Sequence, residues 1–366
     1  MTLRLILLTL AAALTFVACP TTPQPEPTPP PPQSGSPAPP TPPTPPTPPT
    51  PPTPPTPPPP TPPTPQPGDT TAPTVLSFSP NFNSIGVEAN AKIRIEFSEA
   101  MNQAATEAAY QSADMPIVTF TWSPNGRRLE IDPVGDLELT DAGRVYNFVI
   151  RNTATDLAGN ALAQLSSRFR TFRELKKTFT SVGSIDGHLL GERGFDSTNS
   201  TIPVGDTLFT LDGDPHKGFL SFDLTPLETD GLTIPQRITA AKLRIFQTST
   251  AGEPYIDLQV SGRHLLAAHV AFGPGFNLSN ASSNSVILHD LGEISSDDTV
   301  GYKETPNALE SVRDDWQQRV ARENRSQFML FFPLATNGDG LIDSASFNAG
   351  EALIDRPELE VTFLVP

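Results

Sequence analysis

Apolar and polar residues alternate in short runs along residues 69–366. In one run, Ile93, Ile95 and Phe97 fall on one side of an extended chain, whereas Arg94 and Glu96 fall on the other. A period of two is typical of strands that pack one face on a core. The same spacing aligns Val118 with Phe120 and Trp122, Leu129 with Ile131, and Tyr146 with Phe148 and Ile150. The pattern predicts an all-β fold class.

The first half of this region has the organisation of a small sandwich. Turn-forming residues separate its strands, as in Ser123–Gly126 and Asp156–Asn160. Asp156 can accept hydrogen bonds from its own turn, and Gly159 and Asn160 tolerate positive φ. Short, regularly spaced strands without a long amphipathic helix indicate an antiparallel β-sandwich of about 100 residues. We expect Met101 to fill one end of its core as a flexible apolar side chain.

The second half also reads mainly as strands. Strand-like runs occupy residues 206–211, 217–224, 238–247, 255–260, 264–272, 285–291, 327–334 and 359–366. Residues 307–320 differ, because Leu309, Val312, Trp316 and Val320 recur at helical spacing. We predict one helix here, with Asn307 as its N-cap and Trp316 anchored in the core.

The amino-terminal residues have the features of an export signal. Arg4 precedes an apolar stretch that is too short to cross a bilayer comfortably. The segment Phe16–Cys19 resembles the lipobox of bacterial lipoproteins, with Phe16 where leucine is usual. The resemblance implies a signal peptide over residues 1–18 and lipidation of Cys19, the only cysteine of the chain. The alternative is an ordinary signal peptide in which Cys19 has no role.

Residues 19–68 are almost entirely proline and threonine. Proline removes backbone donors and fixes φ, and the tract has almost nothing apolar to bury, so we expect a disordered, polyproline II-like linker. At roughly 3.1 Å per residue, it would reach on the order of 150 Å. We interpret it as a stalk. A ligand for proline-binding domains is the alternative, and O-linked sugars on the threonines remain open.

Residues 69–174 resemble the bacterial Ig-like domain of S-layer proteins. The resemblance rests on the segment Phe97–Met101, on the turn Asp156–Asn160 and on the order of the strands between them. It implies a spacer that presents neighbouring modules. Glu99 and Asp156 could instead form a carboxylate pair for acid–base chemistry or calcium, but the resemblance favours a structural role.

Residues 175–366 resemble the DNRLRE-type modules that are grouped with carbohydrate-binding modules. The resemblance rests on the strands Leu220–Asp223 and Ala240–Phe246, on the tryptophan helix, and on the closing segment Arg356–Val361. It implies a larger, jelly-roll-like β-sandwich and binding of a polysaccharide. Aromatic residues that could line a glycan groove, or equally belong to the core, are Tyr255, Phe272, Phe276 and Tyr302.

Charge and motif content narrow the function. A formal charge of −16 argues against nucleic acid as a partner. The five histidines show no metal-binding or catalytic spacing, which favours a protein that is not an enzyme. No cofactor is expected. Calcium is considered at two loops, whose candidate ligands are Asp212, Asp214, Asn337 and Asp339. We favour turns there, because Asn-Gly and Asp-Gly are hairpin dipeptides.

Together, these features predict a non-catalytic lipoprotein of the cell envelope or surface. Its partners would be the membrane, through the lipid on Cys19, and envelope polysaccharide or other surface proteins. A purely structural or adhesive role is one alternative. A polysaccharide hydrolase that uses paired carboxylates is the other.

Overall fold

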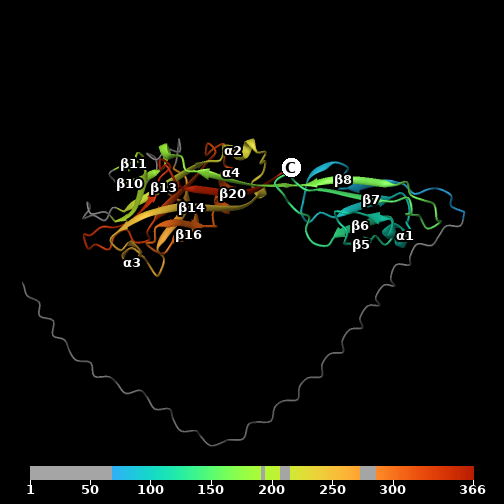
Figure 1. Cartoon of the computed structure of the whole chain (residues 1–366), viewed down its shortest axis with the longest axis horizontal. Coiled ribbons are helices and arrows are strands. Elements are labelled where there is room, and N and C mark those ends of the chain that lie inside the picture. Colours follow the sequence, from blue (N-terminus) through green and yellow to red (C-terminus); the bar gives the residue numbers. More distant parts are fainter. Residues whose placement is uncertain (1–67, 191–193, 207–214, 273–285) are drawn as a thin grey trace, which may run out of the picture. The chain divides into compact units, whose positions relative to one another are not determined.

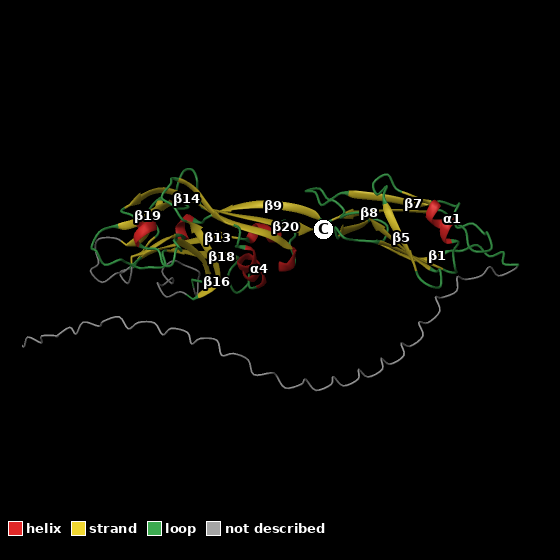
Figure 2. Ribbon diagram, turned by 90° about the horizontal axis from the view of Figure 1, so that it is seen from below, coloured by secondary structure: helices red, strands yellow, loops and turns green. Residues whose placement is uncertain are grey.

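The computed structural model describes residues 68–190, 194–206, 215–272 and 286–366. Within these ranges strands dominate and the helices are short, which confirms the all-β fold class (Figures 1 and 2). The predicted signal peptide, Cys19 and the predicted stalk lie outside the described residues. In the part of the chain that is described, no helix is both long and apolar enough to span a bilayer.

Residues 75–171 form two four-stranded sheets. The first sheet has the order β1 (Val75–Ser79), β3 (Ile93–Phe97), β6 (Arg128–Pro133) and β5 (Val118–Trp122). The second has the order β2 (Ser84–Val87), β8 (Leu165–Thr171), β7 (Val145–Ile150) and β4 (Tyr110–Gln111), with β2 and β8 parallel. The short helix α1 (Gln103–Ala108) precedes β4.

The predicted alternation explains why these sheets pack face to face. In β3, Ile93, Ile95 and Phe97 are buried, whereas Arg94 and Glu96 between them are exposed. Tyr146, Phe148 and Ile150 are likewise buried on β7, in the opposite sheet. Met101 is fully buried in the same core, as predicted. The result is an Ig-like sandwich with one apolar interior.

The rest of the described chain forms one continuous sheet rather than two separate ones. Its main order is β16 (Ile287–Ser295), β15 (Leu265–Val270), β18 (Arg325–Phe331), β13 (His216–Asp223), β12 (Thr201–Asp206), β19 (Asp343–Asn348), β14 (Ile238–Ala251), β20 (Glu358–Val365) and β9 (Arg173–Thr180). Three further strands join it: β10 (Gly187–Leu190), β11 (Phe195–Asp196) and β17 (Gly301–Thr305). A 3-10 turn, η1 (Gly183–Ile185), precedes β10, and another, η3 (Pro235–Arg237), precedes β14.

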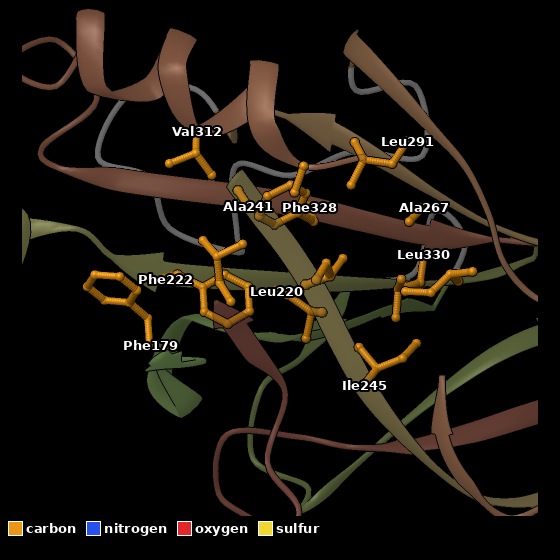
Figure 3. Close-up of a cluster of buried hydrophobic side chains, with 14 of the residues drawn as sticks. Phe179, Leu220, Phe222, Ala241, Ile245, Ala267, Leu291, Val312, Phe328 and Leu330 are labelled. Atoms are coloured by element: carbon orange, nitrogen blue, oxygen red, sulfur yellow. The ribbon is translucent and has the colours of Figure 1, made fainter. Parts of the chain in front are cut away.

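This sheet curls around a single large core. The 14-residue strand β14 pairs with β20 through its first half and with β19 through its second half, and β17 joins it as well. Strand β12 meets β13 only at Gly205 and His216. Side chains from strands far apart in sequence, including Leu220, Ile245, Phe328 and Leu330, therefore face one another inside (Figure 3).

The predicted tryptophan helix is present as α4 (Leu309–Gln317), and Trp316 is fully buried, as predicted. Val312 points from this helix into the core beside Phe328 and Ala241 (Figure 3). The predicted N-cap is wrong, because Ala308 occupies that position. The side chain of Asn307 instead donates a hydrogen bond to the carbonyl oxygen of Leu291 at 2.9 Å, and so attaches the helix start to β16.

The expected strand at residues 255–260 is also wrong. The structure places the short helix α3 (Pro254–Asp257) there, with Pro254 in its first turn. Tyr255 and Leu258 are buried while Ile256 is exposed, and a spacing of three suits a helical turn better than a strand. A further short helix, α2 (Thr225–Thr229), follows β13, so the module has more than the one predicted helix. Most of the expected strand 206–211 lies outside the described residues.

Candidate functional site

The segment that joins β14 to α3 forms the rim of a pocket of about 400 Å³ in the carboxyl-terminal module. We call it the Tyr255 pocket. Its lining residues are Gly252, Glu253, Pro254, Tyr255, Ile256, His264, Ser296, Asp297 and Asp298. They come from three segments: the end of β14 with α3, the approach to β15, and the connection between β16 and β17.

Local sequence explains how the rim is held. Gly252 has a φ of +66°, and a Cβ there would lie 1.9 Å from the carbonyl oxygen of Ile342, so only glycine fits. This close approach lets the backbone N–H of Glu253 donate to Asp343 Oδ1 at 2.8 Å. Pro254 then starts α3. The rim is therefore fixed to the neighbouring strand β19.

Tyr255 forms the apolar wall of the pocket. Its ring packs edge-on against Phe332 at 5.3 Å between centroids, and its hydroxyl donates a hydrogen bond to Gln247. Burial is the main reason why the pKa of Tyr255 is raised, so the hydroxyl stays protonated. Only 7% of the residue is exposed. The ring therefore offers little stacking surface to a ligand.

The rest of the wall is polar and mostly acidic. Lys303 and Thr299 hydrogen-bond to Asp297 and lower its pKa to about 2. His264 lies beside Glu293, with 2.9 Å between its Nδ1 and Glu293 Oε2. Because Asp297 stays ionised at neutral pH, it can accept hydrogen bonds from hydroxyl groups but cannot act there as a proton donor.

The predicted calcium candidates are only partly within the described residues. Asp212 and Asp214 lie outside them. Asn337 Oδ1 accepts a hydrogen bond from the N–H of Asp339 at 3.0 Å, and Asp339 Oδ1 accepts one from Leu341 at 2.7 Å. These are the hydrogen bonds of consecutive Asx turns, which is the arrangement that the turn interpretation predicts. Gly338 and Gly340 have positive φ beside them.

Folding does bring a third carboxylate to this turn. One oxygen each of Asp257, Asp339 and Asp343 lies within 4.8 Å of the other two. The side-chain amide of Asn337 donates to both Asp339 and Asp343, at 3.1 and 3.2 Å, and so offsets part of their repulsion. Asp257 reaches the cluster from α3, 82 residues before Asp339 in the sequence, and spacing alone did not reveal it.

The Glu99 and Asp156 pair considered in the Ig-like region does meet in space, together with Asp69. Burial, followed by the charges of Asp69 and Asp156, raises the pKa of Glu99. Asp156 is 1% exposed and accepts hydrogen bonds from the backbone and side chain of Asn160, both at 2.8 Å. It thus closes its own turn, as predicted, and Gly159 has a φ of +95°.

The proposed glycan aromatics mostly belong to the core. Phe272 is 1% exposed and packs against Phe219, and Phe276 lies outside the described residues. Tyr302 is 38% exposed, but Arg244 covers its ring at 4.2 Å. The structure also brings histidines together that sequence spacing kept apart: His188 stacks on His216, and His269 stacks on His289.

Comparison with known proteins identifies one part of the chain. Residues 69–173 match the family model described as a bacterial Ig-like domain. This segment is therefore a bacterial Ig-like domain, as its motifs predicted. No curated protein matches the chain. The resemblance of residues 175–366 to DNRLRE-type modules stays a prediction.

Solved structures show only distant likeness. The N-terminal part of the bacterial S-layer protein SbsC is 10% identical, with a TM-score of 0.22, over 42% of this chain and 40% of that chain. An L,D-transpeptidase from Mycobacterium smegmatis is 11% identical, with a TM-score of 0.19, over 42% and 76%. The chain thus covers less than half of the SbsC structure that it matches. At these TM-scores neither likeness bears on function.

Proposed function

We propose that this protein is a non-catalytic, surface-displayed lipoprotein that binds a polysaccharide through the Tyr255 pocket of its carboxyl-terminal module. The bacterial Ig-like domain supports a location at the cell surface, because such domains usually present neighbouring modules. The lipobox-like segment at Cys19 and the proline-rich tract support lipid anchoring and display on a stalk.

The pocket itself is the observation that carries the binding proposal. Its lining includes three acidic residues, Glu253, Asp297 and Asp298, beside the largely buried ring of Tyr255. Carboxylates that accept hydrogen bonds from hydroxyl groups, beside an apolar wall, match the alternating polar and apolar surface of a sugar ring. Because the wall carries three carboxylates, neutral sugars or amino sugars are favoured over uronic acids.

The proposal that the protein is not an enzyme has its own support. A glycosidase needs one carboxyl group with a raised pKa to act as an acid beside an ionised partner. In the pocket, hydrogen bonds from Lys303 and Thr299 lower the pKa of Asp297 to about 2. Asp297 is therefore suited to accept hydrogen bonds rather than to deliver protons.

A glycan array tests the binding proposal. We expect the chain to bind neutral or amino-sugar polymers saturably, and Asp298→Ala to weaken binding roughly tenfold, as the loss of a charge-assisted hydrogen bond would. Glu228→Ala, an exposed substitution on α2 away from the pocket, is the matched control and should have no effect. No binding to any glycan on the array would favour a structural or adhesive component. Release of products from a bound polymer would favour a hydrolase.

The anchor is tested separately. Cys19→Ser should abolish acyl labelling and release the protein to the medium, because the lipid is the proposed attachment to the membrane. Labelling that persists in this variant would show that the lipobox interpretation is wrong. This outcome is independent of any sugar binding.

A further inference from the structure

Two adjacent strands and a helix bring two histidines and an aspartate together. His269 on β15 is the register partner of His289 on β16, and their rings stack with centroids 5.3 Å apart. Asp314 approaches them from α4. One ligand atom from each of the three residues lies within 4.8 Å of the other two.

The first of these side chains is held in place by buried partners. His269 is fully buried, and its Nε2 lies 2.9 Å from Asp315 Oδ1. The other oxygen of Asp315 accepts a hydrogen bond from Ser326 Oγ at 2.6 Å, and Arg322 pairs with the same carboxylate. A carboxylate that contacts the second ring nitrogen is the usual support of a metal-binding histidine, because it fixes the tautomer and the ring orientation.

The remaining nitrogen of this ring is not used by the fold. His269 Nδ1 is buried and has no hydrogen-bond partner. A neutral imidazole that donates from Nε2 to Asp315 carries its free electron pair on Nδ1. A buried acceptor without a partner costs free energy, and binding of a metal ion would remove that cost.

We propose that His269, His289 and Asp314 form a binding site for a divalent transition metal ion, with Zn²⁺ as the best match, and that Asp315 positions His269. Two imidazoles and a carboxylate are a typical donor set for zinc with an open coordination position. Asp314 and Asp315 carry two negative charges against the one positive charge of Arg322, so the site can accept a cation.

The geometry needs only a modest adjustment. Zinc bonds of about 2.0–2.1 Å place tetrahedral ligand atoms roughly 3.4 Å apart, so the three groups must close by on the order of 1 Å. The side chains of His289 and Asp314 are 39% and 33% exposed and can move, whereas His269 is fixed. Asp314 Oδ2, which lies 3.8 Å from His289 Nε2, also pairs with Arg322 at 2.8 Å, so the carboxylate must turn to offer Oδ1 to the metal or share Oδ2.

The bound ion would connect α4 to the paired strands β15 and β16, which contact the helix here through side chains. The alternative is that His269, Asp315 and Arg322 are only a buried network that attaches α4 to the sheet. Metal binding separates the two explanations, because a purely structural network has no use for His289.

Titration of the full chain with ZnCl₂ tests the proposal. We expect one Zn²⁺ per chain and a rise in melting temperature on binding. His289→Ala and Asp314→Asn should each weaken Zn²⁺ binding at least tenfold. Asp290→Asn is the matched control, because this exposed carboxylate next to His289 on β16 pairs with Arg263 and lies outside the cluster, and the Zn²⁺ affinity of the variant should be unchanged. Co²⁺ in place of Zn²⁺ should give the visible absorption of a tetrahedral complex.

The proposal is overturned if the chain shows no saturable Zn²⁺ binding, or if His289→Ala binds with the affinity and stoichiometry of the unmodified protein. If Asp314→Asn fails to fold, His289→Ala decides alone, because its side chain is partly exposed and its melting temperature without metal should match that of the unmodified protein.

Discussion

The Ig-like domain and the carboxyl-terminal module treat buried polar groups differently. In the Ig-like domain the buried polar residues are few, and only one of them carries a charge: Thr106, Asp156, Ser167 and Thr171. In the described part of the carboxyl-terminal module, ionisable side chains are buried at many positions, including Asp186, His188, Asp206, His269, Lys303, Asp315 and Asp343. Both modules pack strands around an apolar core. Only the carboxyl-terminal module also buries many ionisable groups, although burying them costs free energy.

This difference fits the proposed division between a presenting module and a binding module. Burying an ionisable group is unfavourable unless hydrogen bonds or opposite charges compensate it. In the Ig-like domain the buried ionisable group is Asp156, and its own turn supplies the compensating hydrogen bonds. The carboxyl-terminal module buries ionisable groups on several strands, and its pocket and its histidine cluster lie among those strands. We therefore expect the stability of this module to depend more on pH and on ligands.

The largest expected effect is the loss of the helix anchor. Trp316→Ala should lower the free energy of unfolding of the carboxyl-terminal module by about 3–5 kcal/mol, because the fully buried indole would leave a cavity. Val320→Ala, at a position 89% exposed, is the control and should change it by less than about 0.5 kcal/mol. Denaturant unfolding checks both, and an equal effect of the two substitutions would contradict the placement of α4.

The second effect concerns Asp186, whose carboxylate accepts the N–H of Gly350 at 2.7 Å beside Glu351. Burial, together with the charge of Glu351, raises its pKa to about 7 from 3.8. The folded state therefore holds an extra proton between about pH 4 and 7, and this module should lose stability as pH rises through that window.

Asp186→Asn cannot ionise and should remove this loss. We expect it to stabilise the module by on the order of 1–3 kcal/mol at about pH 8 and to change little at about pH 4. Urea unfolding at both pH values is the measurement, and Asp136→Asn, an exposed position in the other module, is the control. A stabilisation that is the same at both pH values would show that Asp186 is not protonated as described.

The contribution of Asp156 to the stability of the Ig-like domain should depend on pH in the opposite direction. Burial tends to raise the pKa of Asp156, but hydrogen bonds from Asn160, Gly159 and Ala158 outweigh it, and the net pKa is lowered. The stabilisation that the Asp156 carboxylate contributes is therefore present above its pKa in the unfolded chain, about 4. It is lost as the pH falls through its pKa in the folded domain.

Removal of this carboxylate tests the expected direction. Asp156→Ala should cost the Ig-like domain about 1–2 kcal/mol at neutral pH, and the deficit should shrink at about pH 2. Thermal unfolding at the two pH values measures it. A deficit that does not depend on pH would mean that the volume of the carboxyl group, and not its charge, supports the turn.

The smallest expected effect is at the Asp339 turn. Asp339→Asn keeps an Asx acceptor on an exposed loop and should change stability by less than about 0.5 kcal/mol. Millimolar CaCl₂ should leave the melting temperature of the unmodified chain unchanged. A calcium-dependent rise that Asp339→Asn abolishes would favour the calcium interpretation over the turn.

The sequence predicted the features that depend on local periodicity. Strands such as β3 and β7 were found because their buried residues are two apart, and the Ig-like domain was found because its motifs occur in order. Residues 255–260 were misassigned as a strand because hydrophobicity was weighed without the preceding Pro254, which favours a helical first turn. Asn307 was misassigned as the N-cap because its side chain donates a hydrogen bond to the carbonyl oxygen of Leu291, a tertiary partner.

The candidate sites depend on strand register, which a single sequence does not state. His269 and His289 are 20 residues apart and meet only because β15 and β16 pair at those positions. Asp314 and Asp257 arrive on helices from elsewhere in the chain. The available signal was modest: two histidines on consecutive strand-like runs, which are frequent neighbours in antiparallel sheets.

Strand β20 (Glu358–Val365) has a consequence for the route of assembly. It lies between β9, the first strand of its sheet in sequence, and β14, and both pairings run nearly its full length. The ribosome makes this strand after all the others of the sheet, so its long-range pairings with β9 and β14 cannot form until most of the module has been synthesised. The Ig-like domain ends some 190 residues earlier, so it can fold before the carboxyl-terminal module completes its sheet.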